Sequence, residues 1–234
     1  MNRGFAFLFS GLFLGGLWVH LYYVSIAKKV ETKDSFLHEN VTDSYEQWAW
    51  LSSALRALRV NCVCKNKQAL GSMSGDGYKI ACIDLIPKDD SCIVYSLGSN
   101  GNYIFENAVH ARFPQCTIVT FDQHHFDAPS HVHFVQTKFT SESTITHQRT
   151  LLGHKHVSIL KVDIEGAEWD LVHDIFDADV YDQIEVEIHK PTVAKLQLME
   201  RIADEHFCLA DVNPNVVSLS AVELLFVNKR KLIF

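Results

Sequence analysis

Two carboxylates and a histidine that could perform acid–base chemistry follow apolar stretches of the chain. Asp163 and Glu165 come directly after the run Ile159–Val162, and His189 ends the alternating stretch Gln183–His189. Such stretches predict buried strands, and ligands of open α/β sheets bind beyond the carboxyl ends of strands. We therefore expect all three side chains on one rim, where His189 could take a proton from a substrate hydroxyl.

Asp163 is the second candidate for this base, and it could instead position the substrate or a charged ligand electrostatically. Glu165, two residues later, is expected to contact the substrate. Gly166 follows, and a glycine allows a tight turn from strand to helix. Apolar residues at helical spacing after it predict a helix that begins near Glu165.

A glycine-containing segment between an apolar run and a helical pattern could bind a nucleotide-like ligand. The run Cys92–Leu97 precedes it, and the helical stretch Tyr103–Arg112 follows it. Glycines let the backbone approach a ligand closely, and this arrangement of strand, loop and helix holds nucleotides. The residues expected to contact the cofactor are Gly98, Ser99, Asn100 and Gly101. Asp122 ends the next predicted strand, Thr117–Asp122, and could accept hydrogen bonds from two ribose hydroxyls.

The stretch Lys161–Glu168 resembles the signature of two related methyltransferase families. FkbM-type methyltransferases and the methyltransferase domain 22 family show Lys, hydrophobic, Asp, hydrophobic, Glu, Gly, Ala, Glu there, and every position matches. The segments Glu187–His189 and Glu223–Asn228 are also similar to the family pattern. The resemblance implies a class I methyltransferase that uses S-adenosylmethionine and methylates a hydroxyl oxygen.

The resemblance and the order of predicted elements indicate an α/β fold. We expect a Rossmann-like, seven-stranded, mostly parallel sheet with helices on both faces. The last two predicted strands, Cys208–Val212 and Glu223–Asn228, have no helix between them. This suits the antiparallel last strand of a class I methyltransferase, whereas a nicotinamide-binding sheet more usually ends parallel.

One departure from the family pattern concerns the cofactor site. FkbM-type proteins usually show Asp-x-Gly-Ala-Asn-x-Gly, but Ser96 stands at the position of the acid, and the second glycine comes one residue early. In the family that acid helps to hold the methionine amine, so Glu106 or the side chains of Asn100 and Asn102 would have to replace it. The alternative is a non-catalytic pseudo-methyltransferase or binding domain. An NAD-dependent oxidoreductase is a weaker alternative, because the glycine spacing is not Gly-x-Gly-x-x-Gly.

Composition sets limits on the number of domains and on the partners. The chain has 234 residues and a formal net charge of -7, without a large block of Lys and Arg. This length suits one α/β domain with a full core, and no nucleic acid is expected as a partner. His131 and His133 alternate on a predicted strand, but no Cys or carboxylate joins them in a metal-binding pattern. We therefore expect solvated histidines and no metal site.

The amino-terminal run Gly4–Ile26 is long and apolar enough to cross a bilayer as a helix. We expect residues 1–29 to be a transmembrane signal anchor, 30–43 a stem and 44–234 the methyltransferase-like domain. A cleaved signal peptide, which would give a secreted protein, is the alternative. The anchor predicts a single-pass membrane protein of the Golgi or endoplasmic reticulum with a luminal catalytic domain. Asn40 would then be glycosylated, and the acceptor would be a glycan or another small molecule with a hydroxyl.

Six cysteines fit an oxidising lumen, where disulfides form. Four of them cluster in a turn-rich region, namely Cys62, Cys64, Cys82 and Cys92. We expect at least one bridge among these four. Cys116 and Cys208 lie beside apolar strands, and we expect both to be buried thiols.

Overall fold

The computed structural model describes residues 55–56, 58–71, 78–215 and 221–232. The chain separates into two compact units, Met1–Asp43 and Ser44–Phe234, and the first unit lies entirely outside the described residues. The expected anchor, stem and glycosylation site all belong to that first unit. Within the described residues, no helix is long and apolar enough to span a membrane.

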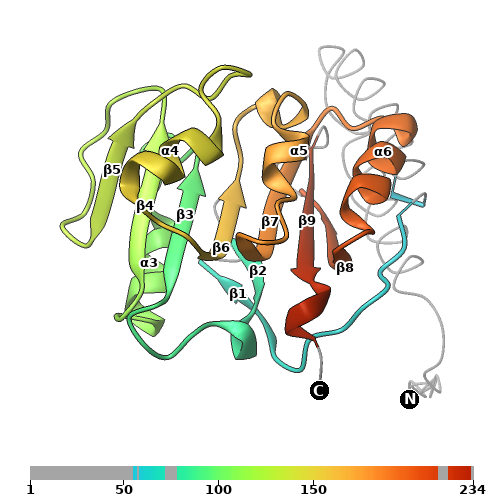
Figure 1. The fold of residues 1–234 in the computed structure, drawn as a ribbon, viewed down its shortest axis with the longest axis horizontal. Helices are drawn as coiled ribbons and strands as arrows, with labels where there is room; N and C mark the ends of the chain where they lie inside the picture. The colour runs from blue at the N-terminus through green and yellow to red at the C-terminus, as the bar shows by residue number, and fades with distance from the viewer. Residues whose placement is uncertain (1–54, 57, 72–77, 216–220, 233–234) are drawn as a thin grey trace, which may run out of the picture. The chain divides into compact units, whose positions relative to one another are not determined.

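A seven-stranded sheet forms the centre of the second unit (Figure 1). The strand order is β5-β4-β3-β6-β7-β9-β8. The strands are β3 Ile93–Leu97, β4 Thr117–Asp122, β5 Val132–Gln136, β6 Val157–Val162, β7 Tyr181–His189, β8 Phe207–Pro214 and β9 Ala221–Asn228. Strands β3 to β7 pair in parallel, and β9 lies antiparallel between β7 and β8. The predicted mostly parallel sheet with an antiparallel last strand is confirmed.

Three helices cover one face of this sheet, which we call the first face (Figure 1). They are α4 Ile145–Leu152, α5 Val172–Ile175 and α6 Val193–Ala203. Their buried side chains form one apolar core with side chains of β3, β6 and β7, such as Leu97 and Ile184. Burial of this apolar surface is the main source of stability on the first face.

The second face has two different covers. Helix α3, Ile104–Arg112, packs over β3 and β4 through Phe105 and Val109. A separate two-stranded antiparallel sheet, β1 Lys67–Leu70 and β2 Lys79–Cys82, contacts β7 and β9. The second face therefore carries a helix on one side and a small sheet on the other.

Strand β7 sends apolar side chains to the first face and polar side chains to the second, because side chains alternate along a strand. Ile184 and Ile188 belong to the apolar core of the first face. On the second face, Gln183 Oε1 accepts a hydrogen bond from the backbone N–H of Cys82 at 2.8 Å. Glu185 and Glu187 face the same side and are buried. A polar layer thus lies between β2 and the main sheet.

Three disulfides cross-link the second unit, namely Cys62–Cys208, Cys64–Cys82 and Cys92–Cys116. The bridge Cys64–Cys82 confirms the prediction of a bridge within the cysteine cluster. The prediction that Cys116 and Cys208 are buried thiols is wrong, because each of them is cross-linked to a member of that cluster.

The fold explains both unexpected bridges. Ile93 lies opposite Thr117 in the parallel pair of β3 and β4, so the cysteines that precede these residues are neighbours. The chain ahead of β1 runs beside β8, where the Asn61 N–H donates to the Leu209 carbonyl oxygen at 2.9 Å. This contact brings the residue after Asn61 next to the residue before Leu209.

The segment after β6 is a turn, and the helix predicted from Glu165 does not form there. Glu165 and Gly166 have φ angles of 57° and 104°, which lie in the left-handed region and exclude a right-handed helix. A 3-10 turn, Ala167–Trp169, follows before the short helix α5. Glu168 Oε1 closes the segment by accepting the N–H groups of Ile164 at 3.0 Å and of Gly166 at 3.2 Å.

Candidate active site

The loop after β3 contacts the end of β6 directly. Gly98, Asn100 and Gly101 have φ angles of 77°, 48° and 74°, so the loop turns through the left-handed region. A Cβ atom on Gly98 would lie 1.7 Å from the carbonyl oxygen of Asp163. Only glycine fits at position 98, because this approach excludes any side chain.

Asp122 holds this loop in place from the end of β4. Its Oδ2 accepts the backbone N–H groups of Ser99 at 3.1 Å and Asn100 at 2.9 Å. Its Oδ1 accepts the N–H of His124 at 2.9 Å. The structure thus gives Asp122 a role in closing the loop, and the contact with a ribose stays a prediction.

Ser96, which stands where the family pattern has an acid, lies beside Lys161. Ser96 is opposite Lys161 in the pairing of β3 with β6, and both side chains are buried. Lys161 Nζ donates a hydrogen bond to the Gly98 carbonyl oxygen at 2.7 Å. Glu106 is buried, and its Oε1 accepts a hydrogen bond from Thr120 at 3.3 Å, while no described residue binds its Oε2. Its role as the replacement for the acid stays a prediction.

The exposed side of the loop fits a cofactor. Asn100, Gly101 and Asn102 are all exposed. A Cβ atom on Gly101 would lie 2.9 Å from the ring of Phe126, and the φ angle of Gly101 is 74°, so this position favours glycine. The amide side chains of Asn100 and Asn102 also remain candidates to hold the amino group of a methionine.

Lys79 of β2 connects the carboxylates at the ends of three segments. Its Nζ is 2.9 Å from Glu187 Oε2 and 3.6 Å from Asp163 Oδ2, and it also contacts Glu223 of β9. Only 1% of the Lys79 side chain is exposed. Burial lowers the pKa of Lys79, but the three carboxylates outweigh burial and raise this pKa overall. The ammonium group therefore stays charged and orients the acids around it.

His189 lies at the centre of this rim. Its Nδ1 is 3.1 Å from Glu168 Oε1. Its Nε2 is 3.4 Å from Glu165 Oε2, 3.8 Å from Glu187 Oε1 and 4.0 Å from Asp163 Oδ1. The structure thus brings together the residues Asp163, Glu165 and His189 that the sequence predicted on one rim.

The charges around His189 affect its chemistry. Burial lowers its pKa, but the hydrogen bond to Glu168 and the charges of Glu168, Glu187 and Asp163 outweigh burial and raise the pKa to about 9. His189 therefore carries a proton at neutral pH, where it is a poor proton acceptor. Burial raises the pKa of Asp163, while the charge of Lys161 opposes this rise.

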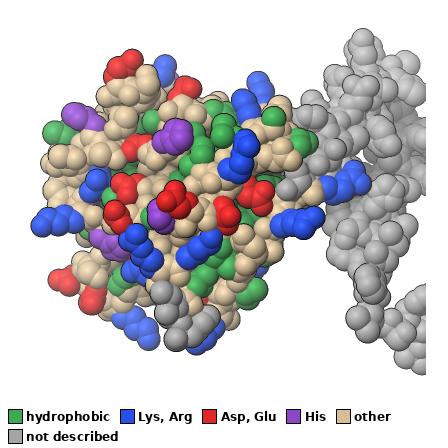
Figure 2. Space-filling view, turned by 45° about the vertical axis from the view of Figure 1, so that its right-hand side comes forward, with side chains coloured by type: hydrophobic (Ala, Val, Ile, Leu, Met, Phe, Trp, Pro, Cys, Tyr) green, Lys and Arg blue, Asp and Glu red, His purple; other side chains and the backbone are tan. Residues whose placement is uncertain are grey.

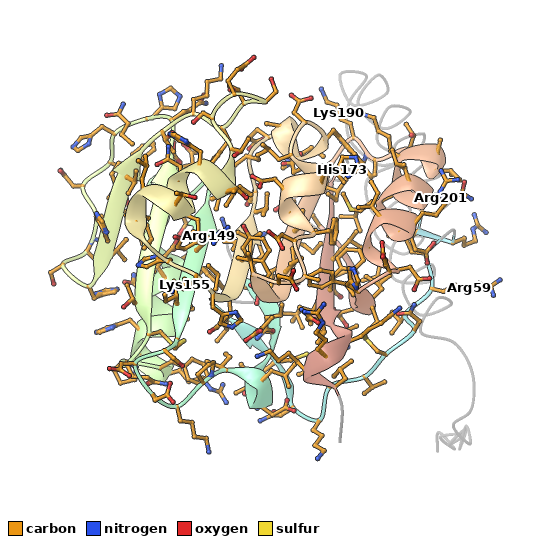
Figure 3. All side chains as sticks on the ribbon, in the orientation of Figure 1. Arg59, Arg149, Lys155, His173, Lys190 and Arg201 are labelled. Carbon is orange, nitrogen blue, oxygen red and sulfur yellow. A yellow bond between two sulfur atoms is a disulfide. The ribbon has the colours of Figure 1, made fainter. Side chains whose placement is uncertain are left out.

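Glu165 is the exposed member of the rim, with 85% of its side chain accessible. Lys190, which follows His189, lies at the upper edge in Figure 3, toward which the carboxyl ends of β3 and β6 point in Figure 1. Figure 2 shows a face on which acidic and basic side chains lie interspersed. At the edge itself, Glu165 and Lys190 are both exposed, so an approaching acceptor would meet groups of both signs.

Sequence reasoning missed Lys79 and Glu223, because their hydrogen bond spans 144 residues of sequence. No local pattern around either residue indicates the contact. His131 and His133, in contrast, do not act together. The ring of His131 stacks on His110 with centroids 4.1 Å apart, and His133 is exposed.

Comparison with known proteins agrees with the fold. The pattern of the methyltransferase domain 22 family, described as a methyltransferase domain, matches residues 24–228. The resemblance to FkbM-type methyltransferases is not tested by this match and stays a prediction. No curated protein matches the chain in sequence.

Several solved structures are similar at low identity. A Plasmodium falciparum protein named as a ribosomal RNA methyltransferase is 12% identical with a TM-score of 0.40, over 58% of this chain and 86% of that one. TrmK of M. capricolum, solved with S-adenosyl-homocysteine, is 10% identical with a TM-score of 0.39, over 62% and 65%. A 16S rRNA (adenine(1408)-N(1))-methyltransferase from Catenulisporales acidiphilia, solved with SAM, is 13% identical with a TM-score of 0.39, over 69% and 98%. At these scores, no substrate is inferred from the likeness.

Proposed function

The chain belongs to the methyltransferase domain 22 family, and from this premise we propose that it transfers a methyl group to a hydroxyl oxygen. Its cofactor is S-adenosylmethionine, the methyl donor of these methyltransferases. The cofactor supplies a methyl group that is already activated on a sulfonium. The protein then has to exclude water, align the acceptor and receive the acceptor's proton.

One observation carries the proposal. The cofactor loop at Gly98 contacts Asp163, which belongs to the acidic rim formed by Asp163, Glu165, Glu187 and His189. A Cβ atom on Gly98 would lie 1.7 Å from the Asp163 carbonyl oxygen. A donor held on the loop and an acceptor held on the rim would therefore be neighbours. This juxtaposition supports a transfer reaction between two bound molecules.

In this proposal Asp163 and His189 both contact the acceptor, and each has a different role. A carboxylate oxygen of Asp163 would accept the hydrogen bond of the acceptor hydroxyl and then its proton. We prefer Asp163 to His189 for the proton, because the raised pKa of His189 leaves that imidazole protonated at neutral pH. His189 would position the acceptor, and the exposed Glu165 would contact a more distant part of it.

The compartment and the substrate class form a further part of the proposal. We propose a single-pass protein of the Golgi or endoplasmic reticulum membrane, or a secreted form, with a glycan or another small hydroxyl compound as acceptor. Three disulfides support an oxidising compartment. The acidic and basic groups of the rim suit a polar acceptor.

A non-catalytic binding domain is the second candidate. Ser96 at the position of the acid, and Asp122 bound to three backbone N–H groups of the chain, favour it. Both residues leave the cofactor with fewer ionic contacts than the family pattern offers. The same experiment separates the two candidates.

The test is calorimetric titration of the full chain, produced in a secretory host and kept in detergent. S-adenosylmethionine and S-adenosylhomocysteine should each bind at one site, and NAD should not bind. A labelled methyl group should then appear on hydroxyl compounds from the secretory pathway with wild-type protein. Asp163→Asn should bind the cofactor with nearly unchanged affinity but transfer the label more slowly. Absence of binding at millimolar S-adenosylmethionine would leave only the binding domain.

A further inference from the structure

Three side chains with metal-binding atoms converge at the carboxyl ends of β6 and β7, namely Asp163, Glu187 and His189. One ligand atom from each lies within 4.8 Å of the other two. His189 Nε2 is 4.0 Å from Asp163 Oδ1 and 3.8 Å from Glu187 Oε1. Atoms about 4 Å apart can surround one point at about 2.0–2.5 Å from each, which is the ligand distance of divalent cations. We propose that these three side chains bind a divalent cation.

Neighbouring groups already orient these ligands. Lys79 Nζ binds Glu187 Oε2 at 2.9 Å and lies 3.6 Å from Asp163 Oδ2. Glu168 Oε1 is 3.1 Å from His189 Nδ1. The other atom of each ligand, Oε1, Oδ1 or Nε2, then faces the common point. Outer partners hold metal ligands in this manner, and a histidine ligand usually donates its second N–H to a carboxylate.

The surroundings of Nε2 provide an independent observation. Among the described residues, three carboxyl groups face this nitrogen at 3.4 to 4.0 Å, and these distances are longer than an ordinary N–H···O hydrogen bond. Only 13% of the His189 side chain is exposed. Glu187 Oε1 accepts a hydrogen bond from Asn215 at 2.8 Å. The spacing therefore leaves room for a cation between the nitrogen and the oxygens, and a bound cation would displace the proton that Nε2 carries at neutral pH.

The charge of the network also favours a cation. The ion pairs on this rim join five carboxyl groups, two ammonium groups and the protonated His189. The acids are Asp163, Glu165, Glu168, Glu187 and Glu223, and the bases are Lys79 and Lys161. Burial raises the pKa of Glu223 to about 8, so four carboxylates face three positive charges at neutral pH. Carboxylates suit Mg²⁺, Ca²⁺ and Mn²⁺, whereas imidazole suits transition metals. The mixed set of two carboxylates and one imidazole therefore points to Mn²⁺.

The position of this site gives the cation a role, and that role rests on the proposed function. The carboxylate of Asp163 lies on the rim, and its backbone packs against Gly98 of the cofactor loop. A cation there could bind the oxygen of the acceptor hydroxyl and make this hydroxyl more acidic. The acceptor oxygen would stay fixed next to the loop, and its proton would pass to Asp163 Oδ2, the carboxylate oxygen that does not face the cation.

The test is a titration of the metal-stripped full chain with Mn²⁺. Binding is measured as the loss of the electron paramagnetic resonance signal of free Mn²⁺. Wild-type protein should bind one Mn²⁺ tightly, and His189→Gln and Glu187→Gln should each weaken binding at least about tenfold, as loss of a partner at a metal site typically does. Asp182→Asn is the matched control. Asp182 is a buried acid of the same strand that pairs with His156 at 2.8 Å, and it lies outside the ligand group.

Binding of S-adenosylhomocysteine by each variant reports whether the fold is intact. The proposal is overturned if wild-type protein binds no Mn²⁺, or if the two ligand variants bind it as tightly as Asp182→Asn does. Mn²⁺ binding without S-adenosylmethionine binding would sustain the cation site and refute the methyltransferase function. The opposite pattern would refute the cation site and leave the methyltransferase function in place.

Discussion

Replacement of Asp122 by alanine separates two roles of that residue. A residue that only binds the cofactor ribose would leave the cofactor-free protein unchanged when it is removed. The structure instead gives Asp122 three backbone N–H donors, from Ser99, Asn100 and His124. We therefore expect Asp122→Ala to destabilise the protein even without cofactor.

The expected loss follows from the exposure of the three donors. Ser99 is 5% exposed, so its N–H would be left without an acceptor in a buried position, which costs about 1–3 kcal/mol. Asn100 and His124 are exposed, and their N–H groups can bind water. Each of these two lost bonds then costs about 0.5–1.5 kcal/mol. A total of about 4 kcal/mol should lower the melting temperature by roughly 8–16 °C for a chain of this length.

The assay is thermal unfolding of the cofactor-free full chain, with Asp127→Ala as the control for loss of an acid. Asp127 is an exposed acid five residues further along the chain. Asp122→Ala should unfold several degrees below both Asp127→Ala and the wild type. A melting temperature within about 1 °C of the control, together with a large loss of cofactor affinity, would refute the role in the loop and favour the ribose contact.

Three other predictions concern stability. Loss of the bridge Cys62–Cys208, through paired serine substitutions, should lower the free energy of unfolding by about 5 kcal/mol in urea titrations, because it closes a loop of 146 residues. Gly98→Ala should abolish cofactor binding and lower the melting temperature strongly. Gly153→Ala should cost only the backbone strain of a φ of 71°, about 1–2 kcal/mol, because nothing lies within 4 Å of the added Cβ. Burial lowers the pKa of His154 below 6.5, so the stability that this neutral imidazole contributes should fall as the pH drops through that value. In denaturation at several pH values, His154→Gln should lose less stability on acidification than the wild type.

Periodicity and turn residues predicted the framework of the sheet. The predicted strand Thr117–Asp122 and helix Tyr103–Arg112 agree with β4 and α3 to within one residue. The alternation in Gln183–His189 marked β7, which extends two residues further at its start. Each of these signals is local, since it depends on which residues share a face of one element.

Contacts between distant segments could not be predicted in the same way. Lys79 reaches Glu187 across 108 residues, and no local pattern marks that pair. Cys116 has an apolar strand beside it, which suits a buried thiol as well as a bridge. Only the register of β3 with β4 places it next to Cys92.

The two faces of the sheet are stabilised by different interactions, and this difference connects the disulfides to the candidate site. The first face buries apolar side chains of three helices. On the second face, β2 meets β7 through charged and amide groups, which contribute little net stability when they are buried. Apolar contacts hold part of the small sheet, since Leu70 and Ala81 pack in the core under α3 and Cys82 packs with Val227 of β9. Lys79, which orients the acidic rim, lies in the polar layer instead. The bridge Cys64–Cys82 ties β2 to the segment ahead of β1, and Cys62–Cys208 ties that segment to β8. The cross-links thus add to these apolar contacts and help to fix β2 beside a polar layer that gains little stability from burial.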